Sequence, residues 1–182
     1  MKLETKRLIL RDIEMKDAKD LIRNINNLKV SRYLLVVPYP YRMKDAKWWI
    51  NHCKDEAKEK PRKNYNFHIE LKEKKGIIGS VGIGKVDRYQ GTTTLGYWLG
   101  EDYWRNRYMY EAASKVLDFA FNKLKLRRIN VSAFPENEGS NSLLKKLGFS
   151  YEGRRIQKCR AKSTGKIHDE NIYGLLKKDY RK

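Results

Sequence analysis

The chain has 182 residues and a hydrophobic content of 40%, which suffices for one domain with a packed core and is short for two. Its 41 lysines and arginines against 22 aspartates and glutamates leave a formal charge of +19, a surplus that attracts anionic partners. No run of about 18 apolar residues is present to span a bilayer. The opening MKLETKRLILR also lacks the apolar core of a secretory signal, so we expect a cytoplasmic protein that does not act on membranes.

The first third of the chain predicts one strand and two helices. Residues 3–13 are rich in leucine and isoleucine and suit a strand, and residues 14–27 carry apolar side chains at helical spacing. A second helix is predicted over residues 44–60, where Pro61 ends it.

The middle of the chain changes to the two-residue period of strands. Residues 66–71, 77–86 and 92–99 alternate and are separated by short turns, which predicts a three-stranded antiparallel meander. Residues 104–124 then return to helical spacing, with alanine, valine, leucine and phenylalanine on one face.

The last third predicts a strand, a short helix and two strands. The strand covers residues 127–134 and the helix residues 139–147, closed by a glycine. Strands follow in residues 149–157 and 167–176. We therefore expect one α/β (α+β) domain over residues 1–182, with a mixed sheet as its core.

The turn before the third long helix raises a functional question. A strand that feeds a helix is a common phosphate cradle, but its turn usually carries glycines, so that backbone amides can approach the ligand. Here Arg105 and Arg107 stand at those positions. The turn is either a phosphate site with changed chemistry or an ordinary surface turn.

Cysteines and histidines give no sign of a metal site. Cys53 and Cys159 lie far apart without a CxxC spacing, so we expect two reduced thiols and no metal. The three histidines are scattered and none is paired with a nucleophile, so we interpret them as structural.

Three separated stretches resemble motifs of one known family. They are LETKRLILRDIEMKDAKDL, LGYWLGEDYWRNRYMYEAASKVLDFAF and VSAFPENEGSNSLLKKLGFSYEG, and they are similar to the opening, acetyl-CoA and C-terminal motifs of GNAT-type N-acetyltransferases. More narrowly, they resemble the branch that includes the RimJ and RimL ribosomal-protein N-terminal acetyltransferases. The resemblance covers nearly the whole chain and is specific for the family but not for the substrate.

The resemblance implies a fold and a donor. The expected fold is a twisted mixed sheet, flanked by helices and splayed between its fourth and fifth strands. Acetyl-CoA would lie in the wedge, and the acceptor amine would arrive from the other side. The unpaired amides at the start of the helix after residue 104 suit the phosphates of coenzyme A.

The turn departs from the family's pattern, Q/R-x-x-G-x-G/A. That pattern would place glycines at 105 and 107, where this chain has arginines, and Gln or Arg at 102, where it has Asp102. We expect binding to survive if Arg105 and Arg107 keep φ below zero and turn their side chains outward, where the guanidiniums could contact phosphate. A further alternative is an inactive relative that has lost the cofactor.

The resemblance assigns cofactor contacts to the turn and to the N-x-x-S motif. Asn137 and Ser140 also suit the capping of the short helix, and the two roles can coexist. Lys145 and Lys146 face either the 3′-phosphate or solvent. The expected cofactor-binding residues are Leu99, Trp104, Arg105, Asn106, Arg107, Tyr108, Met109, Asn137, Ser140 and Lys145.

Acetyl transfer needs a neutral amine and a stabilised leaving thiolate. Glu152 matches the candidate base of the RimL-like branch, and Ser140 matches the candidate acid. From the residues alone, Glu152 is better explained as an exposed carboxylate at a strand end. Glu70 is a second candidate base and Tyr108 a second candidate acid.

Two acidic residues are expected to contact the acceptor. Asp169 resembles the acidic residue that precedes the last strand in many of these enzymes. It would hold the acceptor's ammonium, or it would simply pair with a neighbouring cation. Glu70 is the other candidate for substrate binding.

Three acceptors or partners remain open. The first is the N-terminal α-amine of an acidic or ribosome-associated protein, the second a small amine such as a polyamine or amino sugar. The third is a non-enzymatic role as a basic RNA-binding or ribosome-binding module, since the charge permits direct nucleic-acid binding. The surplus of +19 favours the first over the second, because it repels a polycation. We expect a monomer or a homodimer.

Overall fold

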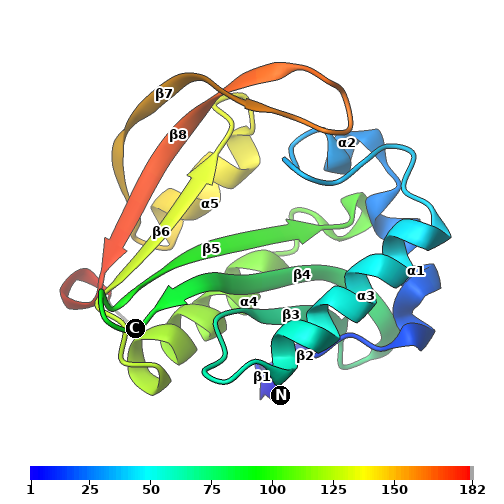
Figure 1. The fold of residues 1–182 in the computed structure, drawn as a ribbon, viewed down its shortest axis with the longest axis horizontal. Helices are drawn as coiled ribbons and strands as arrows, with labels where there is room; N and C mark the ends of the chain where they lie inside the picture. Colours follow the sequence, from blue (N-terminus) through cyan, green and yellow to red (C-terminus); the bar gives the residue numbers. More distant parts are fainter. Residues whose placement is uncertain (181–182) are drawn as a thin grey trace.

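The computed structural model describes residues 1–180, and one eight-stranded sheet runs through them in the order β1-β2-β3-β4-β5-β6-β8-β7 (Figure 1). The strands are β1 (Lys2–Glu4), β2 (Leu8–Arg11), β3 (Tyr65–Leu71), β4 (Lys74–Asp87), β5 (Thr92–Leu99), β6 (Arg128–Ala133), β7 (Ser150–Arg160) and β8 (Ile167–Leu176). The helices are α1 (Ala18–Ile25), α2 (Leu28–Ser31), α3 (Met43–Lys58), α4 (Tyr108–Asp118) and α5 (Glu138–Lys146). The expected mixed sheet with flanking helices is confirmed.

The opening stretch forms a hairpin of two strands, where the sequence predicted one strand over residues 3–13. The chain turns because the amide of Thr5 donates to the carbonyl of Leu8 at 3.0 Å. The turn is also held on α4, since the amide of Arg7 donates to Glu111 at 2.9 Å. A tertiary contact with a helix about a hundred residues away in sequence is invisible to a local pattern.

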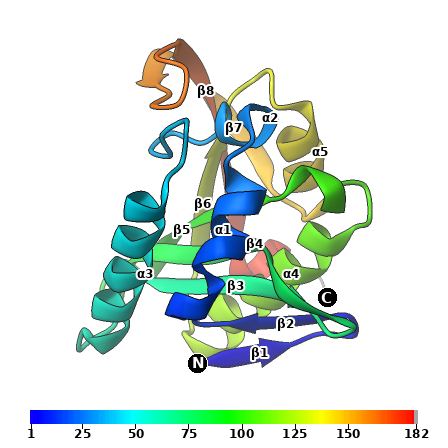
Figure 2. The ribbon, with the colours of Figure 1, turned by 90° about the vertical axis from the view of Figure 1, so that its right-hand side faces the viewer.

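The two faces of the sheet carry different helices (Figure 2). On one face, which we call the α4/α5 face, the largest apolar cluster packs α4 and the inward side chains of β2 to β6 together. On the other, the α1/α3 face, a second cluster joins α1 and α3, with Trp98 of β5 packed against it. Side chains alternate along each strand, so neighbouring residues serve opposite faces.

The sheet splits between β5 and β6, the one parallel pair within it. Their pairing is confined to Thr92–Thr94 against Arg128–Asn130, and beyond it the strands diverge into a wedge (Figure 1). The split was expected between the fourth and fifth strands. It lies between the fifth and sixth because the opening stretch contributes two strands.

The open side of the wedge is bridged at its mouth by two distant segments. The turn between β7 and β8 reaches the loop after α2, where the amide of Lys162 donates to the carbonyl of Leu35 at 3.0 Å. The hydroxyl of Ser163 donates to the carbonyl of Ser31 at 2.9 Å. Figure 1 shows this hairpin arching over the wedge toward α2. The short helix α2 was not predicted.

The long helix after β5 differs from its prediction at both ends. It begins at Tyr108 and not at 104, because a 3₁₀ turn at Glu101–Tyr103 and two left-handed residues come first. Its last turn, Phe119–Lys123, widens to a π-helix. By contrast, β8 has the predicted bounds, Ile167–Leu176.

Candidate active site

The turn from β5 into α4 has the backbone shape of the glycine version. Arg105 and Arg107 have φ values of 62° and 61°, so the condition that we set for binding to survive, φ below zero, is not met, and the glycine-like backbone is kept instead. The indole of Trp104 donates a hydrogen bond to the backbone carbonyl of Leu99 at 2.8 Å. The side-chain amide of Asn106 donates to the backbone carbonyl of Trp104 at 2.9 Å. These two bonds fix the turn from both sides.

The turn keeps its amides available to a ligand. A left-handed residue other than glycine costs about 1–2 kcal/mol, so the fold holds Arg105 and Arg107 in this shape against their preference. Arg107 occupies the N-cap position of α4, and no side chain of the described chain caps that helix end. Backbone amides at an uncapped N-terminus are a ready site for phosphate.

A groove of about 790 Å³ adjoins this turn. It runs along the outer side of α4 and is lined by Arg107, Lys115 and Lys146, among others. Lys146 therefore lies at the groove, whereas Lys145 is exposed on α5 and does not line it. The lining carries four cationic side chains, Arg7, Arg107, Lys115 and Lys146, and four carboxylates, Glu4, Glu111, Asp118 and Asp179. Of the four cations, Arg107 stands at the open N-terminus of α4, where the phosphates of coenzyme A would lie.

Three of the expected cofactor residues have side chains that point elsewhere. Leu99 and Met109 are buried in the main apolar cluster. The ring of Tyr108 packs under the guanidinium of Arg7, with 4.5 Å between the guanidinium carbon and the ring centroid. Any contact from Leu99 or Met109 would use the backbone, and Tyr108 as an acid stays a prediction.

Ser140 lies in the wedge at the start of α5. The side-chain oxygen of Asn137 accepts a hydrogen bond from the amide of Ser140 at 3.2 Å, so Asn137 caps the helix as its residue type suggested. The hydroxyl of Ser140 lies 2.7 Å from the hydroxyl of Tyr97 on β5. This contact joins β5 of the first arm to α5, the helix between β6 and β7 of the second arm.

The residue after Ser140 fastens α5 to the other arm. The side-chain oxygen of Asn141 accepts hydrogen bonds from the hydroxyl of Tyr173 at 2.6 Å and from the side-chain amide of Asn171 at 3.0 Å. Both partners belong to β8. The first turn of α5 is therefore held rigidly beside the wedge.

Glu152 lies on the opposite face of the β6–β8 arm. Its carboxylate accepts a hydrogen bond from Arg128, above Gly174 of β8. Gly174 has no room for a side chain, because a Cβ there would lie 2.5 Å from Glu152 Oε1 and from Arg128 Nη2. Tyr173 faces α5, so Gly174 and Glu152 face away from it, toward the α1/α3 side. The role of Glu152 as a base stays a prediction.

Glu70 belongs to an ion-pair cluster under the N-terminal segments. Arg11 donates to Glu70 at 2.7 Å and binds Asp17 with both terminal nitrogens, at 2.8 and 2.9 Å. Although burial opposes it, the Arg11 hydrogen bonds hold the pKa of Asp17 below its usual value. The structure places Glu70 two strands from β5 and does not bring it to Ser140.

Asp169 is engaged within its own hairpin. Its carboxylate accepts a hydrogen bond from the backbone amide of Gln157 at 2.9 Å. The other carboxylate oxygen lies 3.9 Å from a guanidinium nitrogen of Arg154. Asp169 is therefore paired with a neighbouring cation, which was the second of the two roles that the sequence allowed. Contact with the acceptor stays a prediction.

Glu170, which the sequence analysis passed over, is the better-buried carboxylate of this arm. Its side chain is 13% exposed and accepts hydrogen bonds from Ser132 at 2.7 Å and from Arg155 at 3.2 Å. Since Glu170 and Ser132 share the face of Gly174, they line the α1/α3 side of β6 and β8.

The α1/α3 side of β5 carries an open patch of backbone. Gly96 pairs directly with Gly82 of β4. A Cβ on Gly82 would lie 2.8 Å from a backbone oxygen, but a Cβ on Gly96 would meet nothing within 4 Å. Asn66 and Glu56, joined at 2.7 Å, border this patch from β3 and α3. The space above Gly96 leads into the wedge where β5 leaves β6.

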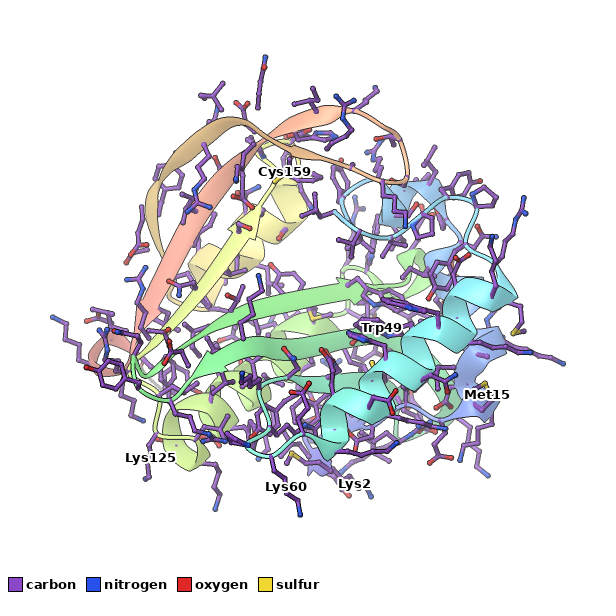
Figure 3. The ribbon with its side chains drawn as sticks, viewed as in Figure 1. Lys2, Met15, Trp49, Lys60, Lys125 and Cys159 are labelled. Carbon is purple, nitrogen blue, oxygen red and sulfur yellow. The ribbon has the colours of Figure 1, made fainter. Side chains whose placement is uncertain are left out.

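The histidines are held in local contacts. Trp49 lies between α3 and the sheet (Figure 3). Its indole donates a hydrogen bond to His68 at 3.2 Å. Burial lowers the pKa of His68 to about 4, and its other ring nitrogen has no partner among the described residues. His52 lies 3.2 Å from Glu56, and His168 stacks on Phe134. Both cysteines are free and buried.

Residues 1–180 contain neither a cluster of metal ligands nor a helix that could span a membrane. No group of three or more histidine, cysteine, aspartate or glutamate side chains is arranged to hold a metal ion. None of the helices in this range combines the length and the apolar character that crossing a bilayer requires.

A family model and a curated relative both identify acetyltransferases as the proteins that this chain resembles. A family model described as an acetyltransferase (GNAT) domain matches residues 7–150. An uncharacterized N-acetyltransferase of Bacillus licheniformis, p20, is 32% identical over 180 residues, which are 98% of this chain and 97% of that protein.

Two solved structures share the fold. The ribosomal-protein-S5-alanine acetyltransferase of Vibrio fischeri superposes with a TM-score of 0.78 at 22% identity, covering 100% of each chain. The spermidine N-acetyltransferase of Vibrio cholerae, in complex with CoA and spermine, superposes with a TM-score of 0.80 at 19% identity, covering 97% of this chain and 99% of that one.

Proposed function

Because the chain belongs to the GNAT family of acetyltransferases, enzymes that take acetyl groups from acetyl-CoA, we propose that its acceptor is the α-amine at the N-terminus of a protein. Membership in that family makes the chain an N-acetyltransferase and overturns our third alternative, a non-enzymatic basic module. The acceptor, including the resemblance to the RimJ and RimL branch, is the part that we propose.

The observation that supports a protein acceptor is the pairing of the carboxylates beside the wedge. Glu152, Asp169 and Glu170 each lie next to an arginine of the same arm. Paired carboxylates offer a polyamine little uncompensated charge, because each is already neutralised by its partner. The β7–β8 hairpin adds surplus cations, which suit an acidic polypeptide: Lys158, Arg160, Lys162 and Lys166.

The acceptor would reach the wedge from the α1/α3 side. Gly96 leaves open space there, and the bridge between Leu35 and Lys162 limits the opening at its mouth. An extended N-terminal segment is narrow enough to enter such an opening, whereas a folded surface is not.

The donor would lie on the other side of the split. Acetyl-CoA supplies the activated acetyl group when bound. The residues that would hold it are the turn amides after Arg105 and the cations at the groove, Arg107 and Lys146. Ser140, on the α4/α5 side, would donate a hydrogen bond to the sulfur that leaves.

The proton chemistry follows from these positions. An α-amine has a pKa near 8 and is mostly protonated at neutral pH, so it must lose a proton before it attacks. Glu152 lies on the α1/α3 side of the arm, which is the side where the amine would arrive. We assign it the base role, acting directly or through one water.

A small polyamine is the second candidate. Glu56 and Glu170 border the same opening, and their side chains are only 14% and 13% exposed. Buried carboxylates on both walls could hold the two ends of a diamine if their present partners moved aside.

The deciding experiment measures CoA release with three acceptors under one condition. They are a short peptide with an acidic N-terminal sequence, the same peptide with acidic residues replaced by lysine, and spermidine. We expect kcat/KM to fall in that order, and mass spectrometry to place the acetyl group on the α-amine. Faster turnover of spermidine than of either peptide would make the polyamine the acceptor.

A further inference from the structure

One hydroxyl contact crosses the wedge at the place where the sheet has already split. The hydroxyls of Tyr97 on β5 and Ser140 on α5 are 2.7 Å apart. Tyr97 lies three residues beyond Thr94, the last residue of β5 that pairs with β6. The contact therefore joins two arms that have lost their backbone pairing.

The ring of Tyr97 is fixed by its surroundings. It packs against the main apolar cluster, on the same face of β5 as Leu95 and Leu99, which are both buried. Burial raises the pKa of Tyr97 to about 12, with the Ser140 hydrogen bond opposing the rise. At neutral pH the phenol keeps its proton and is available as a donor.

Ser140 is restrained just as closely. Its amide is bound by Asn137, and the next residue, Asn141, is bound by Tyr173 and Asn171. The backbone of Ser140 is thus set, and the direction of its hydroxyl proton is the remaining freedom. That proton points to Tyr97 or away from it, depending on which hydroxyl is the donor.

We propose that Tyr97 is a positioning residue for thioester cleavage, which donates to Ser140 Oγ and so leaves the Ser140 proton free to point at the departing sulfur. This inference rests on the proposed function, which puts the sulfur beside Ser140. As the amide bond forms, the carbon–sulfur bond breaks and its electron pair stays on sulfur. The amine's proton goes to the base, and Ser140 stabilises the thiolate until it is protonated.

A different role for the same contact is a latch that holds the two walls of the wedge together. A latch would have to open before acetyl-CoA binds, so its removal would tighten cofactor binding. Removal of a positioning contact would instead leave the Kd of acetyl-CoA unchanged and lower kcat. The two roles are therefore separable by measurement.

The test compares five proteins: the parent, Tyr97→Phe, Ser140→Ala, the double variant and the control Tyr89→Phe. Tyr97→Phe keeps the ring and its packing and removes only the hydroxyl. Tyr89→Phe is the matched control, because Tyr89 is 94% exposed and lies in the turn between β4 and β5, before the stretch of β5 that pairs with β6. For each protein, kcat is measured with whichever acceptor the parent acetylates best, and the Kd of acetyl-CoA is measured by calorimetry.

We expect Tyr97→Phe to lower kcat about tenfold to a hundredfold and to leave the Kd of acetyl-CoA within a factor of two. The double variant should be no slower than Ser140→Ala alone, because Tyr97 acts only through Ser140. Additive losses in the double variant would overturn the inference, as would tighter acetyl-CoA binding with unchanged kcat. A parent that prefers spermidine would refute the protein acceptor but leave this comparison intact.

Discussion

Glu152 is the residue whose assigned chemistry is simplest to test. Glu152→Gln keeps the shape of the side chain and its contact with Arg128, but it removes the basicity. We expect kcat to fall by about 10² to 10⁴, because a general base contributes on that order. The Kd of acetyl-CoA should stay near its normal value, since Glu152 lies on the face away from Ser140. Steady-state kinetics and calorimetry measure the two quantities.

Glu70 supplies the control for that experiment. Its carboxylate is paired with Arg11 at 2.7 Å and lies away from the wedge, so Glu70→Gln should leave kcat nearly unchanged. A base also produces an acidic limb in the pH profile of kcat/KM, and the limb should change only in the Glu152 variant. Full activity of Glu152→Gln with an unaltered limb would move the base elsewhere.

His68 makes stability depend on pH. Burial lowers its folded pKa to about 4, against about 6.5 in the unfolded chain, so the unfolded state binds more protons between these values. Stability from this residue is therefore present above pH 6.5 and is lost as the pH falls toward 4. Between pH 7 and 5 we expect a loss of about 2 kcal/mol in the free energy of unfolding.

Two variants isolate the contribution of His68. His68→Gln retains an acceptor for the Trp49 indole but cannot titrate, so its disadvantage against the parent should shrink as the pH falls. Asn51→Gln, at an exposed position on α3 that carries no titrating group, is the control and should run parallel to the parent. Denaturant titrations at several pH values measure both. A His68 pKa above 6, by NMR of the folded protein, would contradict the prediction.

At the level of elements, the turn into α4 separates backbone shape from charge. Arg105→Gly and Arg107→Gly remove the guanidinium while allowing the observed φ, whereas the alanine variants remove it and keep the strain. If the guanidiniums contact phosphate, both kinds of variant should weaken acetyl-CoA binding by about 1–3 kcal/mol.

Thermal stability then distinguishes the two substitutions. We expect the glycine variants to be more stable than the alanine variants by about 1 kcal/mol each, since only glycine relieves the left-handed strain. Equal acetyl-CoA affinity in the parent and in all four variants would make these arginines ordinary surface charges.

The opening above Gly96 also arises from the arrangement of elements, because it lies where β5 separates from β6. Gly96 has neither a positive φ nor a close neighbour, so a side chain fits there without strain. We expect Gly96→Leu to raise the KM of the acceptor at least tenfold and to leave the Kd of acetyl-CoA unchanged. Gly96→Ala, which adds a single carbon, should have a smaller effect. An unchanged acceptor KM in both variants would place the acceptor's path elsewhere.

How well the sequence predicted an element depended on how local its cause was. The strand over residues 167–176 was predicted with its observed bounds because its alternation continues to both ends. The hairpin at Thr5 was missed because its turn is held by Glu111, on a helix far along the chain. The predicted start of α4 was too early because arginine is a good helix former, and nothing in the sequence marks Arg105 and Arg107 as left-handed.

The same distinction holds within the site. The motif identified Asn137 as the cap and Ser140 beside it, since that contact spans three residues. The Tyr97 contact spans 43 residues, and only the pairing of the sheet brings it together. One signal was present: alternation in LGYWL puts Tyr97 on the inward face with two leucines, where a hydroxyl needs a partner. No local pattern distinguishes Glu170 from Asp169.

On the scale of the whole molecule, the bridge between Ser31 and Ser163 makes the opening a property of distant parts of the chain. The loop after α2 and the β7–β8 turn are fixed to one another, so the width of the mouth is set by both. Lys162, one of the cations of the hairpin, forms part of this bridge through its backbone amide. Charge and access are thus combined at one place on the surface.

The formal charge of +19 acts on a partner over a distance that depends on the salt concentration. If this charge guides an acidic acceptor, kcat/KM should fall as salt rises, because the screening length shortens from about 30 Å at 0.01 M to about 8 Å at physiological ionic strength. The loss should lie in association, so kcat at saturating acceptor should change little. An uncharged peptide of the same length is the control and should respond weakly. Equal salt dependence for both peptides, measured from initial rates of CoA release, would mean that the surplus charge does not select the acceptor.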